Sequence, residues 1–116
     1  MSSITLYHNP RCSKSRAALQ LLQSRGVEPQ IRLYLENPPS RNELEQLLTQ
    51  LNIGPRELLR KGEDAYKENN LKDPAVSDSA LIDAMLAHPK LIERPIAICG
   101  ERAVIGRPPE NVLELL

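Results

Sequence analysis

The sequence contains no tryptophan and no phenylalanine, and aromatic residues make up only 3% of it. Its core must therefore be built from Leu, Ile, Val and Ala side chains. No stretch approaches the roughly 20 consecutive apolar residues of a membrane-spanning helix. Residues 1–5 lack the basic segment and the apolar region that open a signal peptide. We therefore expect no association with a membrane.

An excess of charge of either sign is also missing, because 15 basic and 15 acidic residues cancel in a chain of 116 residues. This balance gives no general attraction to nucleic acid. Two cysteines are too few for a disulfide framework, which predicts a reducing compartment, the cytoplasm. No His and Cys cluster has metal-ligand spacing, so we expect no metal. We also expect no bound cofactor. The length suits a single domain over 1–116, and with no apolar stripe left over we expect a monomer.

The most informative stretch of the sequence surrounds Cys12. The apolar run Ile4–Tyr7 stops at Asn9-Pro10, and a helical pattern begins at once after Cys12. A cysteine at a helix start lies near free backbone N–H groups, where the macrodipole favours an anion. Basic side chains surround it, namely His8, Arg11, Lys14 and Arg16. These conditions favour a reactive thiolate over a buried structural thiol, and the same N–H groups would bind an oxyanion.

The order of predicted elements indicates an α/β fold. A strand at 4–7, a helix at 13–25 and a strand through Ile31, Leu33 and Leu35 form a parallel βαβ unit. A helical insert follows over about 40–90. Strands at 95–99 and 102–105, joined by Gly100-Glu101, form a type II′ hairpin, and a helix from Pro108 places Val112, Leu113 and Leu116 on one face. This order is thioredoxin-like, with a four-stranded mixed sheet.

Two residues near Cys12, Ser15 and His8, each have two possible interpretations. Ser15 stands where a second cysteine would complete a C-x-x-C motif. It either donates a hydrogen bond to the thiolate or to an oxyanion, or is one of the polar residues that are ordinary at a helix start. His8 is either a proton-sharing partner of Cys12 or a loop residue capped by backbone, and its place at the same strand end favours the first. Cys99, inside a predicted strand, reads as core, and its role is left open.

Three arginines are candidate anion ligands. The predicted fold places Arg94 next to the cysteine, while Arg60 and Arg107 sit at element ends where loops converge. Three guanidinium forks around a helix start would suit a tetrahedral oxyanion, because each fork can bind two oxygens. Pro95 falls where thioredoxin-like folds carry a cis-proline that faces the active cysteine, so it is our candidate for a cis peptide bond.

These segments together resemble the glutaredoxin-dependent arsenate reductase (ArsC) family, in order and spacing, over essentially the whole chain. The resemblance rests on His8-Asn9-Pro10-x-Cys12-x-x-Ser15-Arg16, Tyr34–Ser40, Leu58-Leu59-Arg60, Ile92-x-Arg94-Pro95-Ile96 and Arg107-Pro108. It implies that Cys12 attacks arsenate, that Arg60, Arg94 and Arg107 bind the oxyanion, and that His8 and Ser15 help to stabilise the thiolate. It also implies a thiol-arsenate adduct resolved by glutathione as co-substrate and by glutaredoxin as partner, with release of arsenite.

One departure from that pattern is the charge of the cysteine loop. Arg11 and Lys14 stand where the resistance-operon reductases have small neutral residues. The basic version of the loop resembles that of a chromosomal branch of the family. Two other functions therefore remain open. The first is a glutathione-dependent thiol oxidoreductase acting on another oxyanion or a mixed disulfide. The second is a non-enzymatic regulator like the Spx proteins, which Ser15 argues against because those proteins carry C-x-x-C.

Overall fold

The computed structural model describes residues 3–116, which divide into two compact units. The first unit combines the chain up to Asn37 with Arg94–Leu116, and the second is Pro38–Glu93. The first unit contains β1 (Ile4–Tyr7), α1 (Ser13–Ser24), β2 (Gln30–Arg32), β3 (Ile96–Cys99), β4 (Arg102–Ile105) and the 3₁₀ helix η2 (Pro109–Leu115). The second contains α2 (Arg41–Leu51), α3 (Pro55–Leu58), α4 (Asp64–Glu68), α5 (Asp78–Ala87) and the 3₁₀ helix η1 (Pro89–Leu91).

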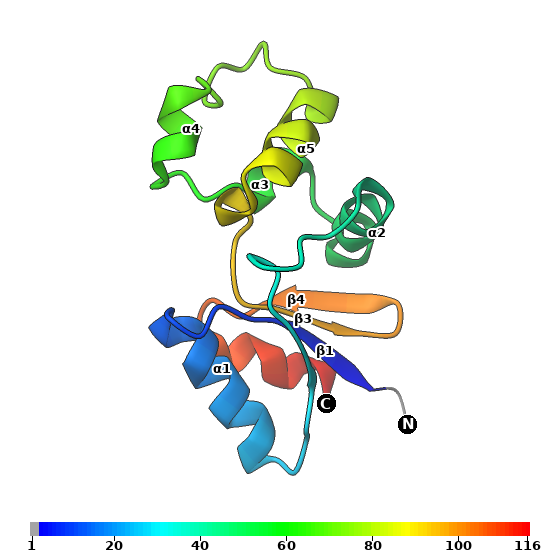
Figure 1. The fold of residues 1–116 in the computed structure, drawn as a ribbon. Coiled ribbons are helices and arrows are strands. Elements are labelled where there is room, and N and C mark those ends of the chain that lie inside the picture. The colour runs from blue at the N-terminus through cyan, green and yellow to red at the C-terminus, as the bar shows by residue number, and fades with distance from the viewer. Residues whose placement is uncertain (1–2) are drawn as a thin grey trace. The chain divides into compact units, whose positions relative to one another are not determined.

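The sheet of the first unit has the predicted mixed topology. Its strand order is β2-β1-β3-β4, with β1 parallel to β2 and antiparallel to β3. The β3–β4 pair closes through Gly100 and Glu101, with Cys99 opposite Arg102. A positive φ at Gly100, and none at Glu101, agrees with the predicted type II′ turn. Figure 1 shows α1 and η2 side by side on one face of this sheet.

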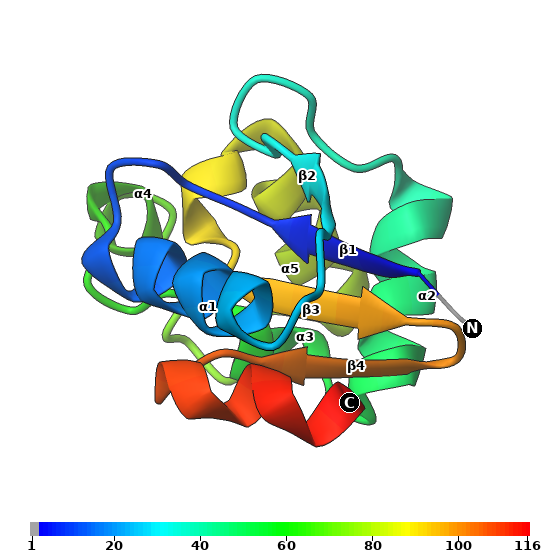
Figure 2. The ribbon, with the colours of Figure 1, turned by 90° about the horizontal axis from the view of Figure 1, so that it is seen from below.

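Apolar residues at strand and helix spacing form the core between the sheet and these helices. The core consists of Ile4, Leu6, Ala18, Leu22, Ala97, Val112 and Leu115. Each fully buried leucine in it contributes roughly 1.5–3 kcal/mol relative to an exposed one. Figure 2 shows α1 lying across β1 and β3, with the C-terminal helix beside β4. The loop that carries Cys12 is thus anchored at both ends, by β1 and by α1.

The predicted second strand is wrong in its length. β2 ends at Arg32, and the chain then turns, since the N–H groups of Glu36 and Asn37 both donate to the carbonyl of Leu33. The turn places the ring of the fully buried Tyr34 parallel to that of Tyr7, with centroids 6.1 Å apart. Ring burial at Tyr34 therefore overrides the alternating pattern of Ile31, Leu33 and Leu35.

The predicted face of the terminal helix is also wrong in part. This helix is 3₁₀, and its buried residues are Pro109, Val112 and Leu115. Leu116, which an α-helical period would place on the buried face, is 55% exposed. A 3₁₀ helix turns once in three residues, so the residue three after Val112, not four, returns to the core.

Helix starts in the second unit follow the ordinary rules. Ser40 and Glu43 form the predicted capping box of α2, and Ser77 caps α5 by accepting a hydrogen bond from the N–H of Ala80.

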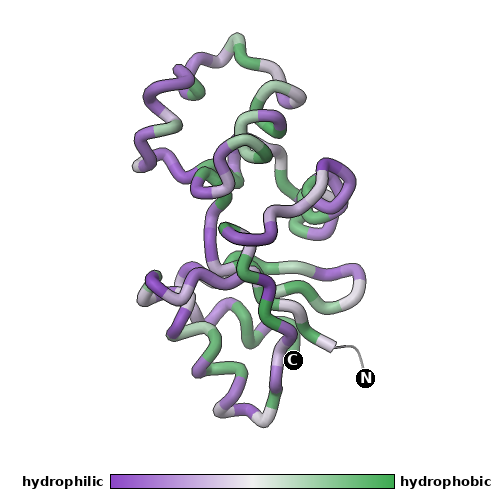
Figure 3. The backbone as a smooth tube through the Cα atoms, viewed as in Figure 1, coloured by the Kyte–Doolittle hydropathy of each residue, from purple (hydrophilic) through white to green (hydrophobic). Residues whose placement is uncertain are grey.

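The excursion between α3 and α5 is largely hydrophilic (Figure 3). It is held by Arg56, whose guanidinium donates to the carbonyls of Leu71, Asp73 and Val76. Within the described residues, no helix is long and apolar enough to span a membrane.

Gly106 marks a close approach between the end of β4 and the start of β3. Its N–H donates to the carbonyl of Pro95, and a Cβ at this position would lie 2.7 Å from Cγ of Pro95 and 3.2 Å from Cγ1 of Val112. Gly106→Ala should therefore lower the free energy of unfolding by about 1–3 kcal/mol, as overpacking does. The measurement is urea denaturation followed by circular dichroism.

Gly62→Ala is the matched control for this prediction. A Cβ at Gly62 has nothing within 4 Å, and its φ is not positive. The control should change the free energy of unfolding by no more than about 1 kcal/mol, in the stabilising direction. Equal destabilisation by both substitutions would show that the contact with Pro95 is not the cause.

Candidate active site

Cys12 lies at the junction of a strand and a helix, as predicted. It is half-buried and is the N-cap residue of α1. Its backbone N–H donates to the carbonyl of Asn9, and its carbonyl accepts from the N–H of Arg16. The side chain of this N-cap residue makes no capping hydrogen bond, and the first turn of α1 contains no acidic residue. The N–H groups at this helix start are therefore open to the sulfur and to a bound anion.

The surroundings of the sulfur lower the pKa of the Cys12 thiol, although burial alone raises it. The lowering comes from the backbone N–H of Ser15, the side chain of Arg94, the N–H of Lys14 and the positive charge of Arg94. All of these stabilise the thiolate relative to the thiol. The site thus favours the nucleophilic form of the cysteine.

Two of the three predicted arginines lie at Cys12. Arg94 acts on the sulfur as described above, and Nη2 of Arg107 lies 3.9 Å from Sγ. Nε of Arg107 donates to the carbonyl of Arg94 at 2.7 Å, which fixes the direction of its guanidinium. The peptide bonds before Pro95 and Pro108 are both cis; that of Pro95 agrees with the sequence prediction, and that of Pro108 was not predicted.

Arg60 belongs to the second unit. Its Nη1 donates to Oε1 of Glu93 at 3.0 Å, and its backbone N–H donates to the carbonyl of Leu91. The Leu59–Ile92 bridge holds the two segments together. The role of Arg60 in anion binding stays a prediction from the sequence.

His8 and Ser15 are buried and form a pair of their own. Nδ1 of His8 lies 2.6 Å from Oγ of Ser15, and burial lowers the pKa of the His8 imidazole, which favours its neutral form. Across the described part of the chain, no hydrogen bond joins Sγ of Cys12 to His8 or to the Ser15 hydroxyl. The backbone N–H of Ser15, not its hydroxyl, contributes to the lowered pKa of Cys12. The catalytic roles predicted for the side chains of His8 and Ser15 stay predictions.

Asn9 is a residue that the sequence analysis did not single out. It is buried, and three of its groups fasten the loop: its carbonyl accepts from Cys12, its Oδ1 accepts from the N–H of Arg11 at 3.0 Å, and its N–H donates to Oγ of Ser15 at 3.0 Å. Asn side chains commonly bond to the backbone two residues on. The Asn9-Pro10 pair in the sequence therefore signals this loop-fastening role in addition to the strand break.

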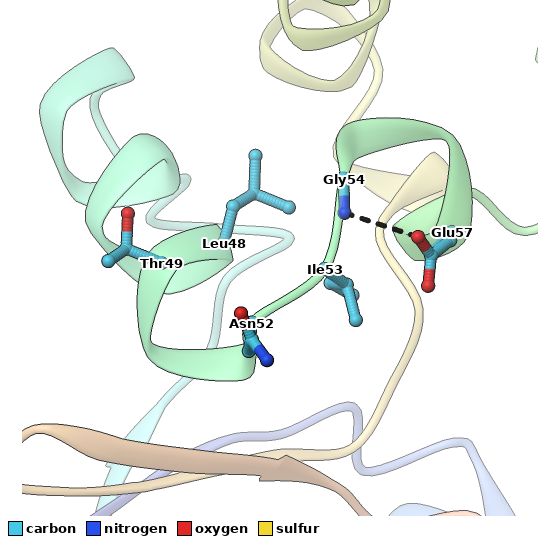
Figure 4. Close-up of a pocket in the computed structure, with 6 residues that line it drawn as sticks. All are labelled: Leu48, Thr49, Asn52, Ile53, Gly54 and Glu57. Atoms are coloured by element: carbon cyan, nitrogen blue, oxygen red, sulfur yellow. Dashed lines mark hydrogen bonds between the residues drawn. The ribbon is translucent and has the colours of Figure 1, made fainter.

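The second unit has an open hollow of about 390 Å³ (Figure 4). It is lined by Leu48, Thr49, Asn52, Ile53, Gly54 and Glu57. The Glu57 carboxylate in its wall accepts from the N–H of Gly54, at the start of α3. The hollow is lined by none of the predicted site residues. Among residues 3–116, no cluster of His, Cys, Asp and Glu could hold a metal ion.

Comparison with known proteins assigns the family. The sequence pattern of the ArsC family matches residues 7–115, almost the whole chain. The protein belongs to the ArsC family. Its predicted membership is thereby confirmed, and with it the thioredoxin-like α/β fold with a four-stranded mixed sheet.

Individual relatives in the ArsC family cover nearly the full chain. The uncharacterized protein YfgD of Escherichia coli K12 is 54% identical over 97% of this chain and 96% of its own. An arsenate reductase of Haemophilus influenzae is 47% identical over 98% of this chain and 99% of its own. A solved structure of an arsenate reductase from Vibrio cholerae superposes with a TM-score of 0.96 and 52% identity, over 99% of this chain and 98% of that one.

Proposed function

We propose that this protein is a thiol-dependent arsenate reductase whose nucleophile is Cys12. The observation that carries the proposal is the meeting of an uncapped helix start, a thiol of lowered pKa and the guanidinium groups of Arg94 and Arg107. A tetrahedral oxyanion is a ligand that such a cluster of N–H and guanidinium donors suits. The relative named arsenate reductase from Haemophilus influenzae, 47% identical over 98% of this chain, supports the choice of arsenate.

In the first step the Cys12 thiolate attacks arsenic. Arsenic acid and the thiol yield the adduct Cys12–S–AsO(OH)₂ and one water, so a sulfur–arsenic bond replaces an arsenic–oxygen bond without change of oxidation state. Arg94 and Arg107 neutralise the anion and stabilise the charge that develops on its oxygens. Arg60 completes the proposed set of arginines, a role supported by the Leu58-Leu59-Arg60 motif.

In the second step an external thiol supplies the electrons. Glutathione attacks the Cys12 sulfur of the adduct, forming a mixed disulfide and releasing As(OH)₃; arsenic gains two electrons and the two sulfurs lose them. Glutaredoxin then reduces the mixed disulfide at the expense of a second glutathione. The motif Cys12-x-x-Ser15 has no second thiol to resolve the adduct internally, which supports an external reductant. No bound cofactor is part of this scheme, and the working form proposed is a cytoplasmic monomer.

The test is the alkylation rate of Cys12 against pH, with and without arsenate. Alkylation follows the thiolate fraction, so a lowered pKa brings the rate to its plateau at a lower pH than the roughly 8.5 of free cysteine predicts. Arsenate should slow the reaction by occupying the site. Cys12→Ser, in which only Cys99 can react, gives the background.

Each other outcome decides against part of the proposal. A low pKa without protection by arsenate would leave a reactive thiol with another substrate, and the glutathione-dependent oxidoreductase would replace arsenate reduction. An ordinary pKa would mean that the helix start and Arg94 do not activate Cys12, and the catalytic assignment would be wrong.

A further inference from the structure

The loop and first turn around Cys12 carry positive charge that the proposed chemistry does not use. Residues 1–27 contain four basic residues (Arg11, Lys14, Arg16 and Arg25) and no Asp or Glu, although the whole chain has no net charge. Arg11, Lys14 and Arg16 are exposed, and no side chain among residues 3–116 pairs with theirs. We call these three residues the basic surface.

The basic surface runs against the local preference of a helix. Positive charge in the first turn opposes the macrodipole, so this position favours Asp and Glu. The other long helices of the same chain have an acidic residue in the first turn, Glu43 in α2, which begins at Arg41, and Asp78 in α5. In α1 the first turn has no acidic residue and contains Lys14 instead. Local rules are broken mainly where a function requires it.

Activation of the thiol does not account for the basic surface. The groups that stabilise the thiolate are the N–H groups of Ser15 and Lys14 and the side chain of Arg94, and the charges of Arg11, Lys14 and Arg16 are not among them. Direct contact with the sulfur is made by Arg107. The three exposed cations are therefore not among the groups that lower the pKa of Cys12, although they belong to the loop and helix turn that bear it.

We propose that Arg11, Lys14 and Arg16 are a docking surface for the carboxylates of an anionic thiol peptide of the glutathione type. This deepens the proposed function and rests on it for its role in turnover. A small oxyanion is bound at the sulfur, whereas a tripeptide whose thiol attacks Cys12 must place its two carboxylates on the surrounding surface. Exposed Arg and Lys side chains raise the local concentration of such an anion and direct its approach.

The same surface serves the step that forms the mixed disulfide. The thiolate of the peptide attacks the Cys12 sulfur of the adduct, a sulfur–sulfur bond forms, and the electron pair of the sulfur–arsenic bond leaves with arsenic as arsenite. The basic surface contributes binding and orientation to this step and exchanges no proton or electron. Its charge selects an anionic thiol over a neutral or cationic one.

Charged disulfides test the docking surface without arsenate. The Cys12 thiolate attacks one sulfur of a disulfide, forming a mixed disulfide and releasing one thiolate. The probes are glutathione disulfide (anionic), 2-hydroxyethyl disulfide (neutral) and cystamine (cationic), with Cys12→Ser as the blank for Cys99. The quantity measured is the ratio of the glutathione disulfide rate to the cystamine rate. A change in intrinsic reactivity of the thiol cancels in this ratio.

The decisive variant is the triple substitution Arg11→Gln, Lys14→Gln and Arg16→Gln. It should lower the ratio by about 10-fold or more, while the wild-type ratio should fall as ionic strength rises. Arg25→Gln, at the other end of α1, removes one exposed charge and should change the ratio less than about twofold. A triple variant with the wild-type ratio would overturn the proposal.

Two further results separate this inference from the proposed function. If the wild type selects the anionic disulfide through these residues but does not reduce arsenate, the docking surface stands and arsenate reduction is wrong. If instead the triple variant keeps the charge selection and loses only the reduction of the mixed disulfide by glutaredoxin, the surface binds the protein partner. That second result would contradict the assignment to a thiol peptide.

Discussion

The Cys12→Ser variant is expected to lose arsenate reduction, with a fall of at least about 10³-fold in kcat/KM. A serine hydroxyl is not ionised near neutral pH, so the strongest nucleophile of the site disappears. It also cannot form a disulfide, so the two electrons that convert arsenate to arsenite have no path through the enzyme. The measurement is arsenite formed per unit time with glutathione and glutaredoxin present.

Cys99→Ser is the matched control, because it removes the other thiol of the chain. Cys99 lies half-buried in β3 and packs against the core of the first unit. This variant should keep most of the activity. Activity that survives in Cys12→Ser but disappears in Cys99→Ser would transfer the nucleophile to Cys99 and would contradict the site proposed here.

The Arg94→Ala variant is expected to lower kcat/KM for arsenate by about 10²-fold, the usual cost of removing one donor to a developing oxyanion. It should also raise the pKa of Cys12, because the side chain and charge of Arg94 both lower that pKa in the wild type. The two effects are separated by comparing the wild type and the variant at a pH where the Cys12 thiol is ionised in both. The loss that remains there measures oxyanion binding alone.

Two matched variants are the controls for this experiment. Arg94→Lys keeps the positive charge but loses the two-pronged fork, so it should recover the low pKa more fully than the activity. Arg102→Ala removes an exposed arginine of β4 whose guanidinium donates to the carbonyl of Glu114. It should leave kcat/KM nearly unchanged. Equal losses in Arg94→Ala and Arg102→Ala would show that a general loss of positive charge, not binding at Cys12, is responsible.

Local patterns predicted the site because its main parts are consecutive in the chain. The strand, the Asn-Pro break, Cys12 and the start of α1 follow one another within 13 residues, so helix-start electrostatics could be inferred directly. The same holds for the capping box at Ser40 and for the Gly100-Glu101 hairpin, where one or two residues specify the backbone. That Arg94 and Arg107 lie near Cys12 could be predicted only from the order of the elements, because these residues are far apart in the sequence.

Where distant contacts decide the structure, local patterns were insufficient. Packing of Tyr34 on Tyr7 ends β2 early, and a 3₁₀ period in place of an α period moves Leu116 out of the core. The hydroxyl of Ser15 bonds to His8 and to the N–H of Asn9, and no sequence spacing distinguishes that pairing from a bond to the sulfur.

The sequence by itself therefore determined the family, the order of the elements and a nucleophilic cysteine at a helix start, because each depends on residues that are neighbours in the chain or on a motif that is read in order. Only the tertiary structure decided which donors lie at the sulfur. The contact from Arg107 to Cys12 spans 95 positions, and the carbonyl of Arg94 that orients Arg107 is placed by the loop before β3. Such contacts arise from packing of the sheet and helices, which no local propensity specifies.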